Sequence, residues 1–483
     1  MSDFQRVAKN TFVLFIAQII SAILSILLGI FIARMLGAVA LGKYSFAYTF
    51  VIFFSIFLDL GYNTLLIREV ARDKSKANKY VSNMLSFRAV SAIIIFVFIV
   101  VTINLMGYPS DTKNVVYLFA VYIFLESFSN IYKVTFRAFE RMEYEAAISI
   151  CSNILRVSLA LAVLFFGYGL VAIALVFIFS NIFDLFLSTI VCERRFVKSE
   201  TEFDGTFFKK TIKIAIPLGM ISIFATIFIR ADTILLSILK GDEVVGWYNA
   251  AYNLVLGLRI IPMLFISALL PTISYYYITS RASLEAVYEK YFRYLFMLGL
   301  PTAMGATLLS DKIILFFYGP GFTNSIVTLQ ILSWDILLIF LYTILGGFLI
   351  SIDRQNQMAL AAAVTAVVNV ILNLALIPYF SYVGAAIATV SAEAILFAIY
   401  FYLLSKHIHL LPLYKILVKP LIALVVMSLF VFFFSWLHFL VLVALGALLY
   451  FTALYAIRGI SKEDITLLQH LLKINQRRKK NGD

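Results

Sequence analysis

The sequence is poor in charged residues. Only 13% of its 483 residues are Asp, Glu, Lys or Arg, whereas 63% are hydrophobic. A soluble domain carries about 25% charged residues, so this composition excludes a soluble enzyme or binding module. Apolar stretches of about 20 residues recur along the chain, and each is long enough to cross a bilayer as a helix. The sequence therefore predicts a multi-pass membrane protein.

Cysteine and histidine are scarce as well. The two cysteines, Cys151 and Cys192, lie within apolar stretches, so no disulfide framework is expected. The four histidines lie at the ends of spans or in the carboxy-terminal tail, and no phosphate-binding glycine loop is present. No polar break is long enough to hold a catalytic domain. We expect a protein without enzyme activity, bound metal or cofactor.

Hydropathy predicts fourteen membrane-spanning helices. Six precede the polar segment 193–210, six follow it, and the apolar tract 420–457 is long enough for two more. We expect an all-α fold of two six-helix lobes around a central cavity, with two further helices. The predicted units are an N-lobe (1–204), a C-lobe (205–410), helices 13 and 14 (411–460) and a basic cytoplasmic tail (461–483).

Lysine and arginine are concentrated in alternate breaks between the spans. With the amino terminus inside, the inner segments hold 28 of the 39 basic residues and the outer segments hold 5. This bias follows the positive-inside rule and accounts for the net charge of +13 without a nucleic-acid partner. It predicts a multi-pass protein of the cell (plasma or inner) membrane with both termini in the cytoplasm.

Three short patterns occur twice in the same order. Gly-x-Tyr-x-x-Ala-Tyr stands at 42–48 and 246–252, an acid–Arg pair at 140–141 and 353–354, and Ala-Ile-Ala at 172–174 and 386–388. Each match joins a span to the span six places later. Because six is even, both halves enter the membrane from the same side, as in transporters built from parallel repeats.

Several ionisable residues fall deep inside the predicted spans. Such residues are costly in a membrane and face a cavity or a partner. They allow two interpretations, a polar cavity for a charged head group or static ion pairs between helices. The residues are Glu126, Arg156, Asp184, Arg230, Asp232, Arg259, Asp335 and Glu393.

Two expectations concern the partners of these charges. Arg230 and Asp232 are two residues apart on a helix and point about 200° away from each other, so they need different partners. Arg259 and Asp335, at similar depth, are the candidates for those partners, and such pairs could close an outer gate. Arg88 lies near the inner end of its span, where a long side chain can reach water by snorkelling.

Several motifs are similar to those of polysaccharide flippases in the multidrug/oligosaccharidyl-lipid/polysaccharide (MOP) superfamily. They are Ala-Arg-Met-Leu-Gly at 33–37, Gly-Lys-Tyr at 42–44, Asp-Leu-Gly-Tyr at 59–62, Ile-Arg-Glu-Val-Ala-Arg at 67–72, Arg-Ala-Phe at 137–139, and Asp232 ahead of Gly-Trp-Tyr at 246–248. The resemblance extends over the whole chain, including its fourteen spans.

The resemblance implies a Wzx-like flippase that moves a lipid-linked (polyprenyl pyrophosphate) oligosaccharide from the cytoplasmic to the outer leaflet by alternating access, for surface polysaccharide or glycan assembly. The substrate-binding candidates are Arg34, Arg156, Arg230 and Arg259. The candidates for proton or sodium coupling, or for a gate, are Glu126, Asp184, Asp232, Asp335 and Glu393. Membrane lipids and glycan-assembly enzymes are the other expected partners.

Two other functions remain open from the sequence. One is an ion-coupled multidrug extruder of the same superfamily, which usually has twelve spans and acidic sites for organic cations. The other is a membrane enzyme of polysaccharide assembly without transport activity. The two additional spans after residue 410 favour the flippase, and the lack of a long loop disfavours the enzyme.

Overall fold

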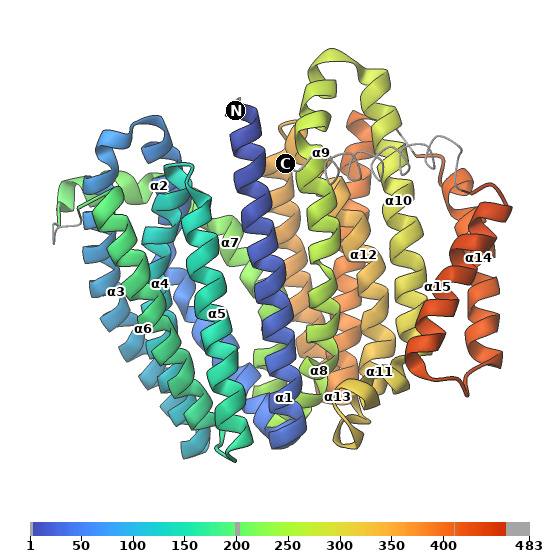
Figure 1. Ribbon diagram of the computed structural model, residues 1–483, viewed down its shortest axis with the longest axis horizontal. Helices are drawn as coiled ribbons and strands as arrows, with labels where there is room; N and C mark the ends of the chain where they lie inside the picture. The colour runs from blue at the N-terminus through green and yellow to red at the C-terminus, as the bar shows by residue number, and fades with distance from the viewer. Residues whose placement is uncertain (1–2, 199–202, 410, 460–483) are drawn as a thin grey trace, which may run out of the picture.

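The computed structural model describes residues 3–198, 203–409 and 411–459, and all regular elements among them are helical (Figure 1). The predicted all-α polytopic fold is confirmed. The basic tail expected at 461–483 lies outside the described residues. The α-helices are α1 (Asp3–Asp59), α2 (Tyr62–Arg72), α3 (Ala77–Leu105), α4 (Ser110–Ala138), α5 (Met142–Phe165), α6 (Leu170–Arg195), α7 (Gly205–Lys240), α8 (Asp242–Leu258), α9 (Ile260–Thr279), α10 (Arg281–Leu308), α11 (Ser310–Phe317), α12 (Ser325–Ser351), α13 (Gln355–His407), α14 (Leu413–Phe433) and α15 (Phe439–Ala456).

Within the described residues, eleven helical segments are long and apolar enough to cross a membrane. A twelfth forms if α10 and α11, which meet at a bend of 75°, count as one span. Two of the eleven contain a break in helical geometry, α1 at Gly37 (φ 82°) and α13 at Ser381 (φ 54°). Counting the two parts of α1 and of α13 as separate spans gives the fourteen that hydropathy predicts.

The helices form two groups with α1 between them (Figure 1). We call α1–α6 the N-lobe, α7–α13 the C-lobe, and α14–α15 the terminal pair, which packs on α10 at one edge of the molecule. The N-lobe and C-lobe meet chiefly where α1 packs on α8. The upper end of the bundle is the end at which α1 begins, and the lower end is the end at which α1 breaks at Gly37 (Figure 1).

The repeated glycine of the sequence pattern forms a reciprocal contact between α1 and α8. A Cβ atom on Gly42 would lie 1.7 Å from the carbonyl oxygen of Asp242, and one on Gly246 would lie 2.0 Å from the carbonyl oxygen of Ala38. Only glycine lets the two helices approach so closely. Each glycine meets the backbone four residues before the other, so the two helices are related by an approximate two-fold axis. The matched residues Glu140 and Asp353 also share a left-handed backbone conformation (φ 58° and 59°).

Helix α7 contacts both lobes. Near the upper end, a Cβ atom on Gly219 would lie 2.8 Å from the amide nitrogen of Gly61, and the hydroxyls of Tyr62 and Thr211 are 3.1 Å apart. The rest of α7 packs along α13 of the C-lobe. Helix α7 therefore joins the two lobes by packing as well as by chain connection.

The expectation that Arg88 snorkels to water is wrong. Its side chain is 1% exposed and donates to Asp59 Oδ1 at 3.1 Å, to Asn63 Oδ1 at 2.7 Å and to the carbonyl oxygen of Ser127. The break between α1 and α2 brings Asp59 and Asn63 to this arginine. A buried guanidinium is tolerated where acceptors and a counter-charge surround it in this way.

Candidate functional site

A cavity of about 350 Å³ lies between the two lobes. We call it the central cavity. Two arginines line it, Arg156 from α5 and Arg230 from α7, and no acidic residue does among those that the structure describes. Its other polar or aromatic side chains are Ser25, Tyr44, Ser45, Tyr48, Thr49, Tyr122, Asn153, Phe177, Asn249, Asn253 and Tyr318. The lining therefore offers positive charge, hydrogen-bond donors and aromatic faces from both lobes.

Aromatic rings hold Arg156 in place. Its guanidinium lies over the rings of Tyr122 and Phe177, with 5.2 and 5.1 Å to the ring centroids, and its Nε donates to Ser180 Oγ at 3.2 Å. Within the described part of the chain it has no ion pair with a carboxylate. Cation–π contacts orient a guanidinium without neutralising it. Arg156 therefore keeps its full charge for a ligand in the cavity.

A second cavity, of about 280 Å³, lies beside the central cavity within the N-lobe. We call it the N-lobe chamber. The two cavities share Asn153 and Arg156 in their linings. The other polar residues that line the chamber are Gln18, Ser21, Glu126, Lys133, Arg137, Glu145, Ser149, Asn181 and Asp184. Its lining therefore contains three acids and three bases and carries no net charge.

Two acids of the chamber are neutralised by bases beside them. Lys133 Nζ lies 2.8 Å from Asp184 Oδ2. Arg137 donates two bonds to Glu145, at 2.7 and 2.5 Å. Glu126, in contrast, has no ion pair among the described residues and is half-buried. The chamber thus presents one carboxylate without an ion pair among the described residues, and Arg156 lines the same chamber.

The three candidate acids of the C-lobe, Asp232, Asp335 and Glu393, are buried inside their own lobe and line neither of these two cavities. Glu393 Oε1 accepts from Arg259 at 2.7 Å, and the same guanidinium nitrogen of Arg259 lies 2.7 Å from the Tyr342 hydroxyl. Asp232 accepts from the Tyr248 hydroxyl and, at 2.7 Å, from the amide of Thr233.

The remaining C-lobe acid, Asp335, is 1% exposed, and neither of its carboxylate oxygens has a hydrogen-bond partner. An ionised carboxylate buried without a partner costs several kcal/mol. A cation or a proton that reached Asp335 would remove that cost.

The structure confirms that Arg230 and Asp232 face different surroundings, since Arg230 lines the central cavity and Asp232 contacts Tyr248. The partners expected for them are wrong. Arg259 pairs with Glu393 instead, because α13 brings this acid beside the end of α8. Asp335 has neither a hydrogen bond nor an ion pair with Arg230 among the described residues.

Arg34, the fourth substrate-binding candidate, lies apart from the other three. It donates to the carbonyl oxygen of Phe316 at the lower end of the molecule and lines neither the central cavity nor the N-lobe chamber. Sequence reasoning missed the rings around Arg156, Tyr122 and Phe177, although their partners Tyr44 and Tyr48 belong to the repeated motif. It also missed the amides Asn153 and Asn181, because no spacing rule brings them to one chamber.

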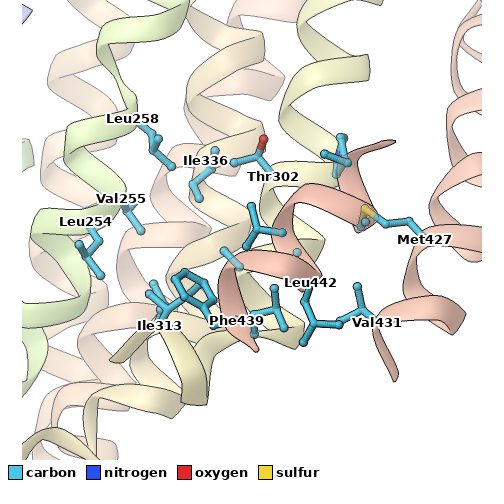
Figure 2. A pocket seen from close by; sticks show the side chains of 18 of the residues that line it. Leu254, Val255, Leu258, Thr302, Ile313, Ile336, Met427, Val431, Phe439 and Leu442 are labelled. Atoms are coloured by element: carbon cyan, nitrogen blue, oxygen red, sulfur yellow. The ribbon is translucent and has the colours of Figure 1, made fainter. Parts of the chain in front are cut away.

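An apolar groove of about 410 Å³ lies on the other side of α8, between the C-lobe and the terminal pair (Figure 2). In Figure 2, Leu254, Val255 and Leu258 of α8 lie across the groove from Met427 and Val431 of α14. Thr302 is the one polar side chain in its lining. The neighbouring α8 residues Asn253, Leu256 and Gly257 line the central cavity. One helix therefore separates a cationic cavity from an apolar groove.

The family model and the two relatives described next all carry names from polysaccharide or glycan biosynthesis. The model of a family described as polysaccharide biosynthesis protein matches residues 7–277. The capsular polysaccharide biosynthesis protein CapF of Staphylococcus aureus is 22% identical over 408 residues, covering 82% of this chain and 99% of the relative. The probable low-salt glycan biosynthesis flippase Agl15 of Haloferax volcanii is 26% identical over 178 residues, covering 37% of this chain and 38% of the relative.

Solved structures share the fold at low sequence identity. The lipid II flippase MurJ in an inward closed conformation superposes with a TM-score of 0.76 at 18% identity, covering 92% of this chain and 99% of that chain. An inward-facing multidrug resistance transporter of the MATE family, in the MOP superfamily, gives 0.66 at 16% identity, covering 80% of this chain and 95% of that chain. The fold is thus one that membrane flippases and drug transporters share.

Proposed function

The chain belongs to the polysaccharide biosynthesis protein family, and on this premise we propose that it carries a polyprenyl-pyrophosphate-linked oligosaccharide across the cell membrane. A charged, sugar-bearing head group cannot cross hydrocarbon unaided, because it would lose its hydration without replacement. The observation that carries the proposal is the central cavity, which has Arg156 and Arg230 in its lining and no acid.

The two arginines suit a pyrophosphate. Each guanidinium offers five N–H donors in a planar fork that matches phosphate oxygens, and charge-assisted bonds of this kind are about twice as strong as neutral ones. Arg156 comes from the N-lobe and Arg230 from the C-lobe. A pyrophosphate between them would therefore interact with both lobes at once. Arg259 and Arg34 are weaker candidates, because Arg259 is already paired with Glu393 and Arg34 lies outside the cavity.

The apolar groove suits the polyprenyl tail. Burying a CH₂ group gains about 0.8 kcal/mol relative to water, so a tail stays in lipid or in a lining as apolar as this one. Because α8 alone separates the groove from the central cavity, a tail in the groove keeps its head group within reach of the arginines.

Transport runs by alternating access, from the cytoplasmic to the outer leaflet. The basic residues of alternate loops support cytoplasmic termini, which makes the upper end cytoplasmic. At the lower end, α1 and α8 are in contact at Gly42 and Gly246. Release on that side requires these two helices to separate, and the approximate two-fold relation between the lobes supports such a motion.

Coupling to protons or sodium belongs to the buried C-lobe acids Asp232, Asp335 and Glu393. These side chains are 1% exposed and are separate from the central cavity, so an ion there would act on helix packing rather than on the substrate. Glu126 and Asp184, the other two coupling candidates, line the N-lobe chamber, where a substrate can reach them. Glycan-assembly enzymes remain proposed partners on the basis of the family.

A multidrug extruder for organic cations is disfavoured by the same cavity. A cationic drug needs an acid or an uncharged aromatic cage, whereas this lining carries two fixed positive charges. An assembly enzyme is disfavoured because the acids and bases of the chamber are mostly paired with each other.

The test is reconstitution of the purified protein into liposomes that contain a fluorescent polyprenyl-pyrophosphate oligosaccharide, with a quencher confined outside. We expect the wild type to accelerate translocation and Arg156→Ala and Arg230→Ala to lose most of the acceleration. Arg354→Ala, an exposed arginine in the turn before α13, is the matched control and should behave as the wild type. If the wild type leaves the glycolipid in place and expels an organic cation down an ion gradient, the extruder is correct.

A further inference from the structure

We infer that the N-lobe chamber binds the sugars next to the pyrophosphate, that these sugars are uncharged, and that Glu126 accepts hydrogen bonds from their hydroxyls. This inference rests on the proposed function and adds the class of substrate to it. It assigns the chamber a ligand different from that of the central cavity, which it adjoins at the shared lining residues Asn153 and Arg156.

The charges of the two cavities differ in kind. The central cavity has two arginines and no acid in its lining, so its net charge is +2. The N-lobe chamber has three acids and three bases, and Arg156 is the one base common to both. A cavity with two unopposed positive charges favours an anion, whereas a neutral cavity lined by alternating donors and acceptors favours a polyhydroxyl group. The anionic and the sugar part of a head group would thus separate into the two spaces.

Arg156 fixes where the change from phosphate to sugar occurs. A phosphate held by Arg156 and Arg230 has the chamber directly beside it, because Arg156 lines both spaces. A sugar linked to that phosphate would enter among Gln18, Asn153 and Ser149, which offer amide and hydroxyl groups. The aromatic rings that hold Arg156 also present apolar faces of the type on which sugars pack.

Glu126 makes the chamber select for an uncharged sugar. Asp184 and Glu145 are occupied by Lys133 and Arg137, but Glu126 has no ion pair within the described part of the chain. An ionised carboxylate accepts from two hydroxyls at once and repels another carboxylate. A neutral sugar therefore gains hydrogen bonds at Glu126, whereas a uronic acid in the same place would meet a like charge.

The C-lobe cavity of about 240 Å³ that Arg281, Arg354 and His407 line shares no lining residue with the central cavity. The acid–base pair of Arg259 and Glu393 in the same lobe is buried with Tyr342 and lines neither the central cavity nor the N-lobe chamber. The head group would therefore lie to one side of the molecular axis, with its sugars in the N-lobe alone.

The experiment measures binding by calorimetry to the full chain in lipid nanodiscs. Three probes share one short polyprenyl pyrophosphate: the first has no sugar, the second carries one N-acetylhexosamine, and the third carries one hexuronic acid. For the wild type we expect the N-acetylhexosamine probe to bind about tenfold tighter than the sugar-free probe, since a hydrogen bond to a charged group contributes about 1.5–3 kcal/mol. The hexuronic acid probe should bind no tighter than the sugar-free one.

Two chamber variants and one control complete the experiment. Glu126→Gln should lose most of the tenfold gain, which is measured as the ratio of the affinities for the N-acetylhexosamine and sugar-free probes within the same variant. Gln18→Ala, at an exposed side chain of the same chamber, should lose part of the gain without a folding defect. Glu143→Gln is the matched control, because it removes the same charge outside the chamber, and it should change nothing.

The inference on sugars and the proposed function fail in different ways. Equal affinity for the sugar-free and N-acetylhexosamine probes would overturn the sugar site while leaving the pyrophosphate site in place. Tight binding of the hexuronic acid probe would overturn the assignment of uncharged sugars. If the wild type binds none of the three probes, the proposed function fails and this inference fails with it.

Discussion

The same pair of tyrosines has opposite surroundings in the two lobes. In the N-lobe, Tyr44 and Tyr48 of the repeated motif stack in parallel, with centroids 6.3 Å apart, and line the central cavity with Arg156. In the C-lobe, Tyr248 and Tyr252 stack at 5.3 Å, but they are 0% and 2% exposed, and Tyr248 donates to buried Asp232. The N-lobe has a cavity beside the motif, whereas side chains pack around the motif in the C-lobe.

The difference lies in a few residues rather than in the backbone. The offset of 213 that relates Glu140 to Asp353 places Asn369 opposite Arg156. Asn369 is fully buried, whereas Arg156 faces the cavity. A repeat that fixes helix positions therefore leaves each lobe free to differ, with an arginine facing the central cavity in the N-lobe and a buried asparagine in the C-lobe.

The first prediction concerns the contact where the lobes are alike. Gly42→Leu and Gly246→Leu should each destabilise the protein by more than about 4 kcal/mol, because the new Cβ atom would lie within 2.0 Å of a backbone oxygen in either case. The yield of monodisperse protein in size-exclusion chromatography and the melting temperature measure this effect. Gly29→Ala, where no atom lies within 4 Å of the added Cβ, is the control. A marked difference between the two leucine variants would break the symmetry described here.

The second prediction tests the buried ion pair of the C-lobe. Arg259→Gln leaves Glu393 buried without its counter-charge and should cost about 3–5 kcal/mol of stability. Thermal unfolding in detergent measures the loss. The double variant with Glu393→Gln should recover much of it, since residue 393 then carries no charge. A double variant as unstable as the single one would show that the pair contributes by packing alone.

The third prediction replaces Arg156 of the N-lobe by asparagine, the residue at the matching C-lobe position 369. Arg156→Asn should slow glycolipid translocation by about 30- to 100-fold, the equivalent of 2–3 kcal/mol for charge-assisted bonds to phosphate. Its melting temperature should change little, because Arg156 has no carboxylate partner among the described residues. Transport at the wild-type rate would remove Arg156 from the substrate site.

The smallest effect is expected where the chain passes from one lobe to the other. The amide of Phe207, followed by Lys79, holds the pKa of Asp204 below its usual value, and Asp204 caps the start of α7. A lowered pKa stabilises the fold above the ordinary pKa of about 4, and this contribution is lost as the pH falls through the lower folded value. Hydrogen exchange at residues 205–210 should therefore speed up below about pH 4, beyond the intrinsic pH effect. In Asp204→Asn this additional step should be absent.

Much of the fold was predictable because it depends on local pattern. Hydropathy identified the spans, and the repeated motif identified matching positions in the two halves, although the contact between Gly42 and α8 came only from the structure. The positions of Asp232 and Glu393 within their spans predicted that both would be buried. Their partners could not be predicted, because Tyr248 and Arg259 reach them from other helices. The environment of Arg88 could not be predicted either, because the break in the chain after Asp59 is what brings acceptors to its guanidinium.

The candidate site was predictable in part for the same reason. Arg156 and Arg230 were identified as intramembrane charges, and the structure places both in one cavity. The neutrality of the N-lobe chamber depends on which acids and bases pair across helices, which charge counting does not give. The apolar groove was invisible in a sequence where nearly every span is apolar, so only the placement of α14 and α15 beside α10 reveals it.

The packing of α7 has a consequence for how the protein is made. As the chain leaves the ribosome, the first six spans are complete before Gly219 has been synthesised, yet Gly61 and Tyr62 both have contacts with α7. The N-lobe thus enters the membrane with one of its surfaces uncovered. A fragment that ends before residue 205 would lack the helix that covers this surface, so the first half of the chain matures only once the second half has begun.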